Sequence, residues 1–187
     1  MIHHLLQAIT DALKLDLKKE IPEDDDHWGI TPIADPTNIT LPYLTLYPSK
    51  LQVDHPLQQQ SHSSTQSDPL APLTITQEFQ QDFVIELYDK TPSNLEKRAS
   101  LVIGSLLTNH DILINRYNTT EIQANYQTNQ ISTCHHLRQF QFHAGIPTYV
   151  SNVMGLQLNF TAIGHLSMSR SVPDSQNMIQ TINISTK

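Results

Sequence analysis

The chain has 187 residues, of which 38% are hydrophobic and 16% are charged, and its formal net charge at pH 7 is −7. This length fits one domain with a substantial core. An acidic chain is a poor general nucleic-acid binder, because phosphate binding needs clustered Lys and Arg. An acidic surface could instead line a channel through which DNA passes without binding, because like charges repel. The single cysteine, Cys134, excludes an intrachain disulfide and a cysteine-based zinc site.

Two segments carry apolar residues at helical spacing. Residues 2–17 predict an amphipathic helix that ends before Pro22, with a stripe of Ile2, Leu5, Leu6, Ile9 and Leu13. Residues 93–109 predict a second helix, because Ser93 and Glu96 form an S-x-x-E capping box. Its expected core stripe is Leu95, Ala99, Val102, Ile103, Leu106 and Leu107.

Alternating apolar residues predict strands in three places, namely 39–47, 74–89 and 156–162. Residues 135–143 alternate weakly, Gly145–Pro147 suggests a turn, and Gly164 with His165 suggests a bulge or a strand end. We expect a short helix or strand at 111–117, an irregular loop or polar hairpin at 118–133, and a further strand near 178–185. The fold class predicted is α+β, with a mixed or antiparallel sheet of about four to six strands packed on the two helices.

Three polar segments are candidates for partner contacts. Residues 54–73 are rich in Gln, Ser and Pro, and favour a flexible arm within a single domain 1–187. Such an arm is either a plain disordered insertion or a segment that orders on a neighbouring subunit. The acidic run 23–26 is either a solvated loop or an edge for a basic partner. Trp28 follows this acidic run. We expect its side chain either to fill a space in the core or to act as an anchor at a protein interface.

The sequence carries no pattern typical of catalysis or cofactor binding. It has no H-E-x-x-H, no G-x-S-x-G, no P-loop and no G-x-G-x-x-G. Adjacent histidines on a strand point to opposite faces, so His135 and His136 are not a chelate by themselves. Cys134 lies beside His135, whereas catalytic pairs are usually brought together by the fold. We therefore expect no enzyme activity, no cofactor and no metal.

The order of these elements resembles the tail terminator, or cap, proteins of long-tailed phages and of phage-tail-like contractile injection systems. The resemblance rests on the N-terminal helix, the strand LPYLTLY at 41–47 and the strand QDFVIELY at 81–88. It continues with the capped helix and with LQLNF at 156–160, followed by Gly164-His165-Leu166. It covers residues 2–17, 39–47, 77–108 and 155–170, and the segments 54–73 and 118–133 are additions to that plan.

The resemblance implies a structural protein of a virion or phage-tail-like particle, assembled in a bacterial cytoplasm. Terminators form a homohexameric ring that caps the tail tube, stops its polymerisation and joins it to the neck. The implied partners are other copies of the chain, the tail tube protein, the sheath protein of a contractile tail and a neck or stopper protein. DNA would pass through the lumen without specific binding, and no membrane is involved.

The same resemblance suggests which residues meet partners. Hypothetical contacts in the loop 23–28 and the arm 54–73 are Asp24, Asp25, Asp26, Trp28, His55, Gln58, Gln59 and Gln60. Glu86, Gln157 and Asn159 are the hypothetical lumen or intersubunit residues. Other interpretations are a different neck or tail-completion protein such as a stopper, a tube protein, a monomeric accessory protein, or an enzyme that uses Cys134, His135, His136 and His143.

Overall fold

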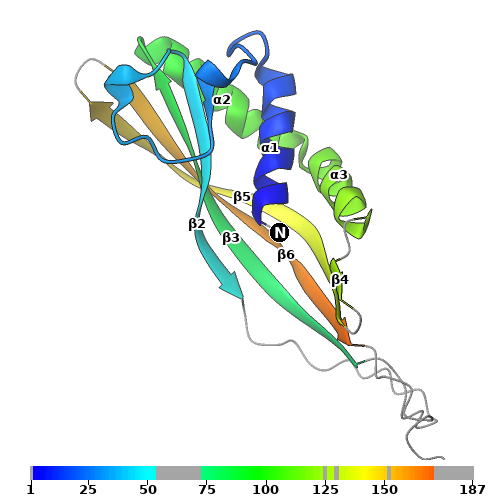
Figure 1. The fold of residues 1–187 in the computed structure, drawn as a ribbon. Coiled ribbons are helices and arrows are strands. Elements are labelled where there is room, and N and C mark those ends of the chain that lie inside the picture. The colour runs from blue at the N-terminus through cyan, green and yellow to red at the C-terminus, as the bar shows by residue number, and fades with distance from the viewer. Residues whose placement is uncertain (1, 54–72, 124–125, 129–130, 151–152, 171–187) are drawn as a thin grey trace, which may run out of the picture.

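The computed structural model describes residues 2–53, 73–123, 126–128, 131–150 and 153–170 (Figure 1). Its helices are α1 (Ile2–Leu17), α2 (Pro92–Thr108) and α3 (His110–Gln123), with short 3-10 segments η1 (Asp25–His27) and η2 (Pro36–Asn38). Its strands are β1 (Trp28–Gly29), β2 (Tyr43–Val53), β3 (Leu73–Asp89), β4 (Tyr126–Thr128), β5 (Ile131–Val150) and β6 (Val153–Arg170).

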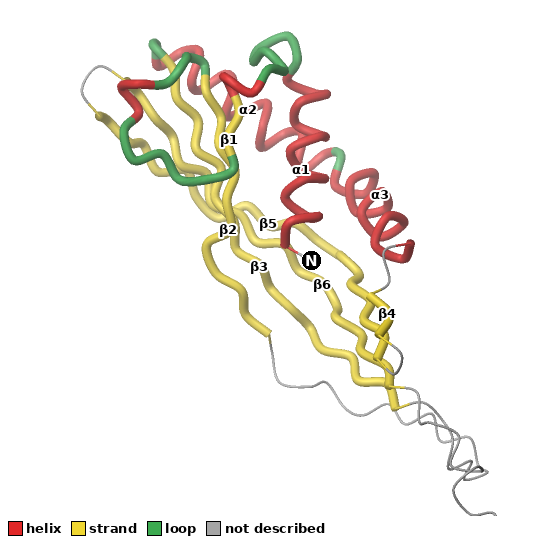
Figure 2. The backbone as a smooth tube through the Cα atoms, viewed as in Figure 1, coloured by secondary structure: helices red, strands yellow, loops and turns green. Residues whose placement is uncertain are grey.

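The strands form one mixed sheet in the order β1-β2-β3-β6-β5-β4. β1 runs parallel to β2, and every other neighbouring pair is antiparallel. The three helices lie on one side of this sheet (Figures 1 and 2). The predicted α+β class is therefore confirmed, with six strands among the described residues.

The core lies between the helices and the near face of the sheet. Because side chains alternate along a strand, β3 directs Phe79, Phe83, Ile85 and Leu87 to this face, and all four are buried. The ring of Phe83 stacks on Phe160 of β6, with centroids 5.4 Å apart. The predicted stripe of α1 packs against them through Leu5, Leu6, Ile9 and Leu13. Burial of these side chains holds the helix to the sheet.

A buried ion pair fixes α2 against the end of β3. The guanidinium of Arg98 pairs with the carboxylate of Asp89, and its Nε donates to the Glu20 carbonyl oxygen at 3.0 Å. Burial lowers the pKa of Arg98, because the charged form loses water. Lys97, one residue earlier, pairs at the surface with the Glu20 carboxylate at 2.6 Å. The end of α1, the end of β3 and α2 are thus joined by one polar network.

The helical predictions need three corrections. Thr91, not Ser93, caps α2: its hydroxyl accepts from the Asn94 N–H, and Pro92 occupies the first turn, where a missing N–H costs nothing. Leu107 was expected in the core stripe but is 40% exposed. The segment at 111–117, predicted as a short helix or strand, is helical, but it is part of the longer α3. α3 continues into the stretch predicted as a loop or polar hairpin, and the rest of that stretch contains the short antiparallel β4–β5 pairing, as the hairpin alternative expected.

The strand predictions also need correction. β2 begins at Tyr43 rather than residue 39, since its pairing with β3 starts only there, and it continues past Pro48 to Val53. Gly145–Pro147 is not a turn, since β5 runs through it in register with β6. Gly164 does not end β6, which pairs regularly with β3 as far as Arg170. A register shift does occur beside Gly164 in the pairing with β5, but the extra residue lies in β5, between Leu137 and Gln139. The possible strand near 178–185 and residues 54–72 of the arm lie outside the described residues.

Candidate interaction surface

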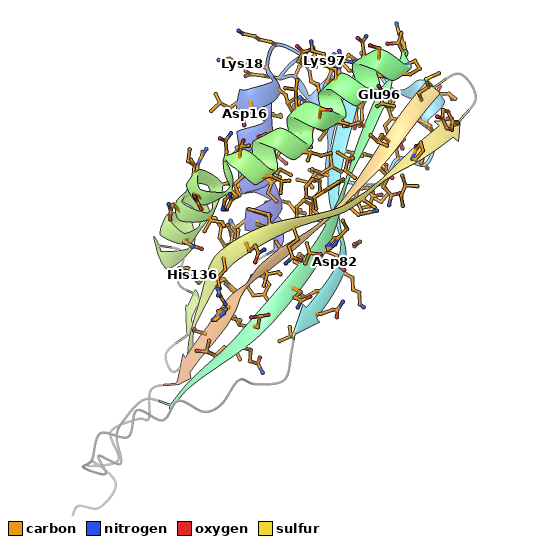
Figure 3. All side chains as sticks on the ribbon, turned by 180° about the vertical axis from the view of Figure 1, so that it is seen from behind. Asp16, Lys18, Asp82, Glu96, Lys97 and His136 are labelled. Carbon is orange, nitrogen blue, oxygen red and sulfur yellow. The ribbon has the colours of Figure 1, made fainter. Side chains whose placement is uncertain are left out.

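The sheet face turned away from the helices, called the open face here, is mainly polar. β3 places Glu78, Asp82 and Glu86 on it, because residues four apart on a strand share a face. Figure 3 labels Asp82 on the side of the sheet away from the helices that carry Asp16 and Lys97. Antiparallel sheets commonly keep one face solvated in this way. The neighbouring strand β6 adds Gln157, Asn159, Thr161, Ile163 and His165.

Glu86 is held by two tyrosine hydroxyls. Tyr47 donates to Oε1 at 2.7 Å and Tyr88 donates to Oε2 at 3.0 Å. Burial, followed by the hydrogen bond to Glu86, raises the pKa of Tyr47. Burial, followed by the negative charge of Glu86, raises the pKa of Tyr88. Both tyrosines therefore stay neutral donors at physiological pH, and neither neutralises the carboxylate charge.

Gln157 and Asn159 lie beside this group on β6. Gln157 is directly opposite Glu86, and Asn159 is opposite Val84, one step along the same face. The two amides contact each other, since Gln157 Nε2 donates to Asn159 Oδ1 at 2.9 Å. The structure thus brings together three residues that the sequence suggested as a lumen or intersubunit surface. Their contact with a partner stays a prediction.

A second polar group on the open face was missed by sequence reasoning. Thr161 Oγ1 donates to Asp82 Oδ1 at 2.6 Å, and His143 Nε2 lies 2.6 Å from the same hydroxyl. Because the threonine proton is used on Asp82, His143 must donate to Thr161. These residues border an open hollow together with Ser49, Gln80 and Asn159. The alternation of β3 could have placed Asp82 on this face, but the register of β5 was needed for His143.

The acidic run at 23–26 lies next to β1, the strand at one edge of the sheet. Asp24, Asp25 and Asp26 are exposed around η1, and Lys14 Nζ approaches Asp25 at 3.6 Å. Trp28 follows in β1 and is only 7% exposed, with its Nε1 donating to the Pro22 carbonyl at 2.6 Å. Trp28 is therefore a core plug in the single chain. Its role as an interface anchor stays a prediction, and the exposed aspartates are better placed for contact.

The remaining candidates are spread over the molecule. His55, Gln58, Gln59 and Gln60 lie outside the described residues. His135 and His136 pair with Leu166 and His165 respectively, so they point to opposite faces as expected for neighbours on a strand. Over the described ranges, no group of three or more His, Cys, Asp or Glu side chains is arranged to hold a metal ion. None of the described helices is long and apolar enough to span a membrane.

Comparison with solved structures gives a remote likeness, and the two sequence comparisons give none. No protein-family model matches the chain. No curated protein matches it either. Among solved structures, it is similar to a chain of the virion of a native gene transfer agent particle, with a TM-score of 0.36 and 12% identity over 84% of this chain and 97% of that chain. At this TM-score and identity, neither a shared fold nor a shared function follows.

Proposed function

We propose that this chain is a structural component of a phage-like particle, and specifically a tail terminator. The observation that carries the proposal is the division of the molecule into a helical side and a polar open face. Among the described residues, that face carries the carboxylates Glu78, Asp82 and Glu86, and also two cations, Lys50 opposite Asp82 and Arg138 beside Glu78. Asp82 and Glu86 on that face are held by the hydroxyls of Thr161, Tyr47 and Tyr88. Hydroxyl donors stabilise a carboxylate without cancelling its charge.

A polar open face on which the described carboxylates outnumber the lysine and arginine side chains suits the inner wall of a ring through which DNA moves. Like charge keeps the phosphate backbone from binding, whereas a lysine-rich wall would hold it. The helical side would then form the outside of the ring. A ring of identical subunits, which we propose to be a hexamer, closes through heterologous interfaces. The acidic run at Asp24–Asp26, exposed beside β1, is available to a basic neighbour.

In this proposal the chain acts by geometry and performs no catalysis. One face of the ring binds the last ring of tail tube protein, and in a contractile tail it also holds the last sheath ring. The other face does not reproduce the tube interface, so polymerisation stops there and a neck or stopper protein docks. The particle would be assembled in a bacterial cytoplasm.

The test is to remove the chain from the particle-producing cell. Without a terminator, tail tubes should exceed their normal length and should not join heads in electron micrographs. Supply of the intact chain should restore both properties. Tubes of normal length that merely fail to join heads would instead indicate a stopper, and normal particles would exclude both functions.

A further inference from the structure

Two stretches of the sheet have an edge that no described strand covers. β4 pairs with β5 only over Ile131–Thr133, and β1 pairs with β2 only at Leu44 and Thr45. Within the described residues this leaves Ala144–Tyr149 of β5 (the β5 edge) and Lys50–Val53 of β2 (the β2 edge) with a neighbour on one side only. Backbone N–H and C=O groups on a free edge are a template for another strand.

The exposed apolar side chains of the sheet gather at these two edges. Among the strand residues whose side chains are described, the large exposed hydrophobics are Leu51 (42%), Val53 (47%), Ile146 (47%) and Tyr149 (74%). The central strands β3 and β6 contribute none of them. Apolar residues concentrated on an exposed sheet edge are a recognised mark of association between chains.

We propose that the β2 edge of one copy pairs with the β5 edge of the next copy, so that the sheets join around the ring. This inference rests on the proposed ring and names the contact that closes it. The occupant of each edge is a second copy of this chain, because each copy offers both halves of the contact. Such an interface is heterologous. The ring closes when successive rotations bring the last copy into contact with the first.

Strand direction favours this pairing. Three antiparallel steps, β2 to β3, β3 to β6 and β6 to β5, make β2 and β5 run in opposite directions. Copies related by rotation about a ring axis from which the strands are tilted would therefore place β2 antiparallel to the neighbour's β5. Antiparallel strands form well-aligned hydrogen bonds, so the existing pattern would continue unbroken from copy to copy.

The offset between the two edges also fits a closed sheet. The β2 edge lies beside Phe79–Asp82 of β3, whereas the β5 edge lies beside Met154–Asn159 of β6, which pair with the other end of β3. Neighbouring copies would thus be shifted along the strand direction. A closed barrel requires tilted strands and a stagger of this kind.

Both edges are interrupted, which limits the pairing to short segments. Register shifts separate Pro48 from Lys50 in β2 and Phe142 from Ala144 in β5, and Pro147 lacks an N–H. Bulges and prolines on edge strands prevent indiscriminate association. Between these interruptions each edge keeps regular pairing with its own neighbour, and we expect only these segments to pair between copies.

Side-chain alternation provides a sharp test of this contact. Gln52 and Ile146 belong to the open face, whereas Leu51 and Tyr149 belong to the helical face. In a Cys134→Ser background, Gln52→Cys is combined with Ile146→Cys, and Leu51→Cys with Tyr149→Cys. The matched controls exchange partners, so that Leu51→Cys meets Ile146→Cys and Gln52→Cys meets Tyr149→Cys. Positions two residues away on each strand are included so that other antiparallel registers are sampled.

After mild oxidation of assembled rings, we expect a ladder of linked subunits from the same-face pair that matches the register of the contact, and none from opposite-face pairs, because a one-residue slip reverses the side of every residue. Equal linking by both kinds, or by neither, would overturn the inference. Rings that cap tubes without same-face linking would reject this contact but leave the terminator proposal intact. Absence of both rings and tube capping would count against both.

A single charge on the edge gives a second readout. Ile146→Lys should prevent ring assembly, because a lysine on an edge strand opposes the approach of another strand. Since Ile146 is already half exposed, the melting temperature of the single chain should not change. Leu101→Lys, at an exposed position on α2, is the matched control and should leave assembly unchanged if α2 takes no part in ring closure. Normal rings from Ile146→Lys would contradict the inference.

Discussion

The side chain of Asn118 in α3 bonds both backbone groups of Leu137 in β5. Asn118 Oδ1 accepts from the Leu137 N–H at 2.8 Å, and Asn118 Nδ2 donates to the Leu137 carbonyl at 3.0 Å. Both residues are buried. The amide therefore takes the place of a neighbouring strand where β5 has left its pairing with β4, and it ties α3 to the sheet.

Asn118→Ala should lower the free energy of unfolding by about 1–3 kcal/mol, since a buried N–H and a buried C=O lose their partners. Asn118→Asp keeps an acceptor for the N–H but removes the donor to the carbonyl, so it should also destabilise. Urea denaturation at neutral pH measures both changes. Asn94→Ala, at an exposed position in α2, is the control. A stability of Asn118→Ala equal to that of the control would show that the bridge contributes nothing.

Two glycines should respond to alanine in opposite directions. At Gly164 a Cβ would lie 2.5 Å from the His136 carbonyl oxygen and 2.7 Å from the Phe79 ring. Gly164→Ala should therefore cost about 1–3 kcal/mol through overpacking. At Gly104, inside α2, a Cβ would meet nothing within 4 Å, so Gly104→Ala should stabilise by about 0.5–1 kcal/mol. Thermal unfolding distinguishes the two, and a shift of the same sign for both would contradict the packing described for β6.

Two neighbouring cations on α2 should differ greatly in importance. Arg98→Met leaves the buried carboxylate of Asp89 without its cation, and breaking such a pair costs about 3–5 kcal/mol. Lys97→Met breaks only a surface pair with Glu20, which water and salt screen, so this change should alter stability much less. Adding Asp89→Asn to Arg98→Met should recover part of the loss. Denaturation of the three variants measures this, and equal effects of Arg98→Met and Lys97→Met would exclude a special role for the buried pair.

The tyrosines that hold Glu86 predict a stability loss at alkaline pH. Their pKa values are raised in the folded chain, so their contribution is complete below the unfolded tyrosine pKa of about 10 and declines as the pH rises above it. The double variant Tyr47→Phe/Tyr88→Phe should be less stable at neutral pH because Glu86 loses both donors. Its stability should also fall less steeply above about pH 10 than that of the original chain.

Urea denaturation at a series of pH values provides the measurement. Tyr149→Phe, which changes a highly exposed tyrosine, is the control and should keep the original slope. An unchanged slope in the double variant would mean that Tyr47 and Tyr88 do not couple ionisation to folding.

The elements predicted best from sequence are those whose pattern is long and regular. α1 and β3 have uninterrupted apolar periodicity, and the alternation of β3 also placed Glu86 on the polar face. The length of β5 was not predicted, because its register shifts break the alternation of apolar residues and because the sequence Gly145–Pro147 is typical of a turn. α3 has a weak apolar pattern. Its position depends on the contact between Asn118 and Leu137, which cannot be predicted from the sequence around either residue. The grouping of Asp82, Thr161 and His143 requires the pairing of three strands.

The most direct test of the terminator proposal is the length of tail tubes grown from purified tube protein with and without this chain. We expect added chain to shorten the length distribution as its ratio to tube protein rises, with a ring of density at one end of each tube in electron micrographs. An unchanged distribution and bare tube ends at every ratio would contradict the proposal.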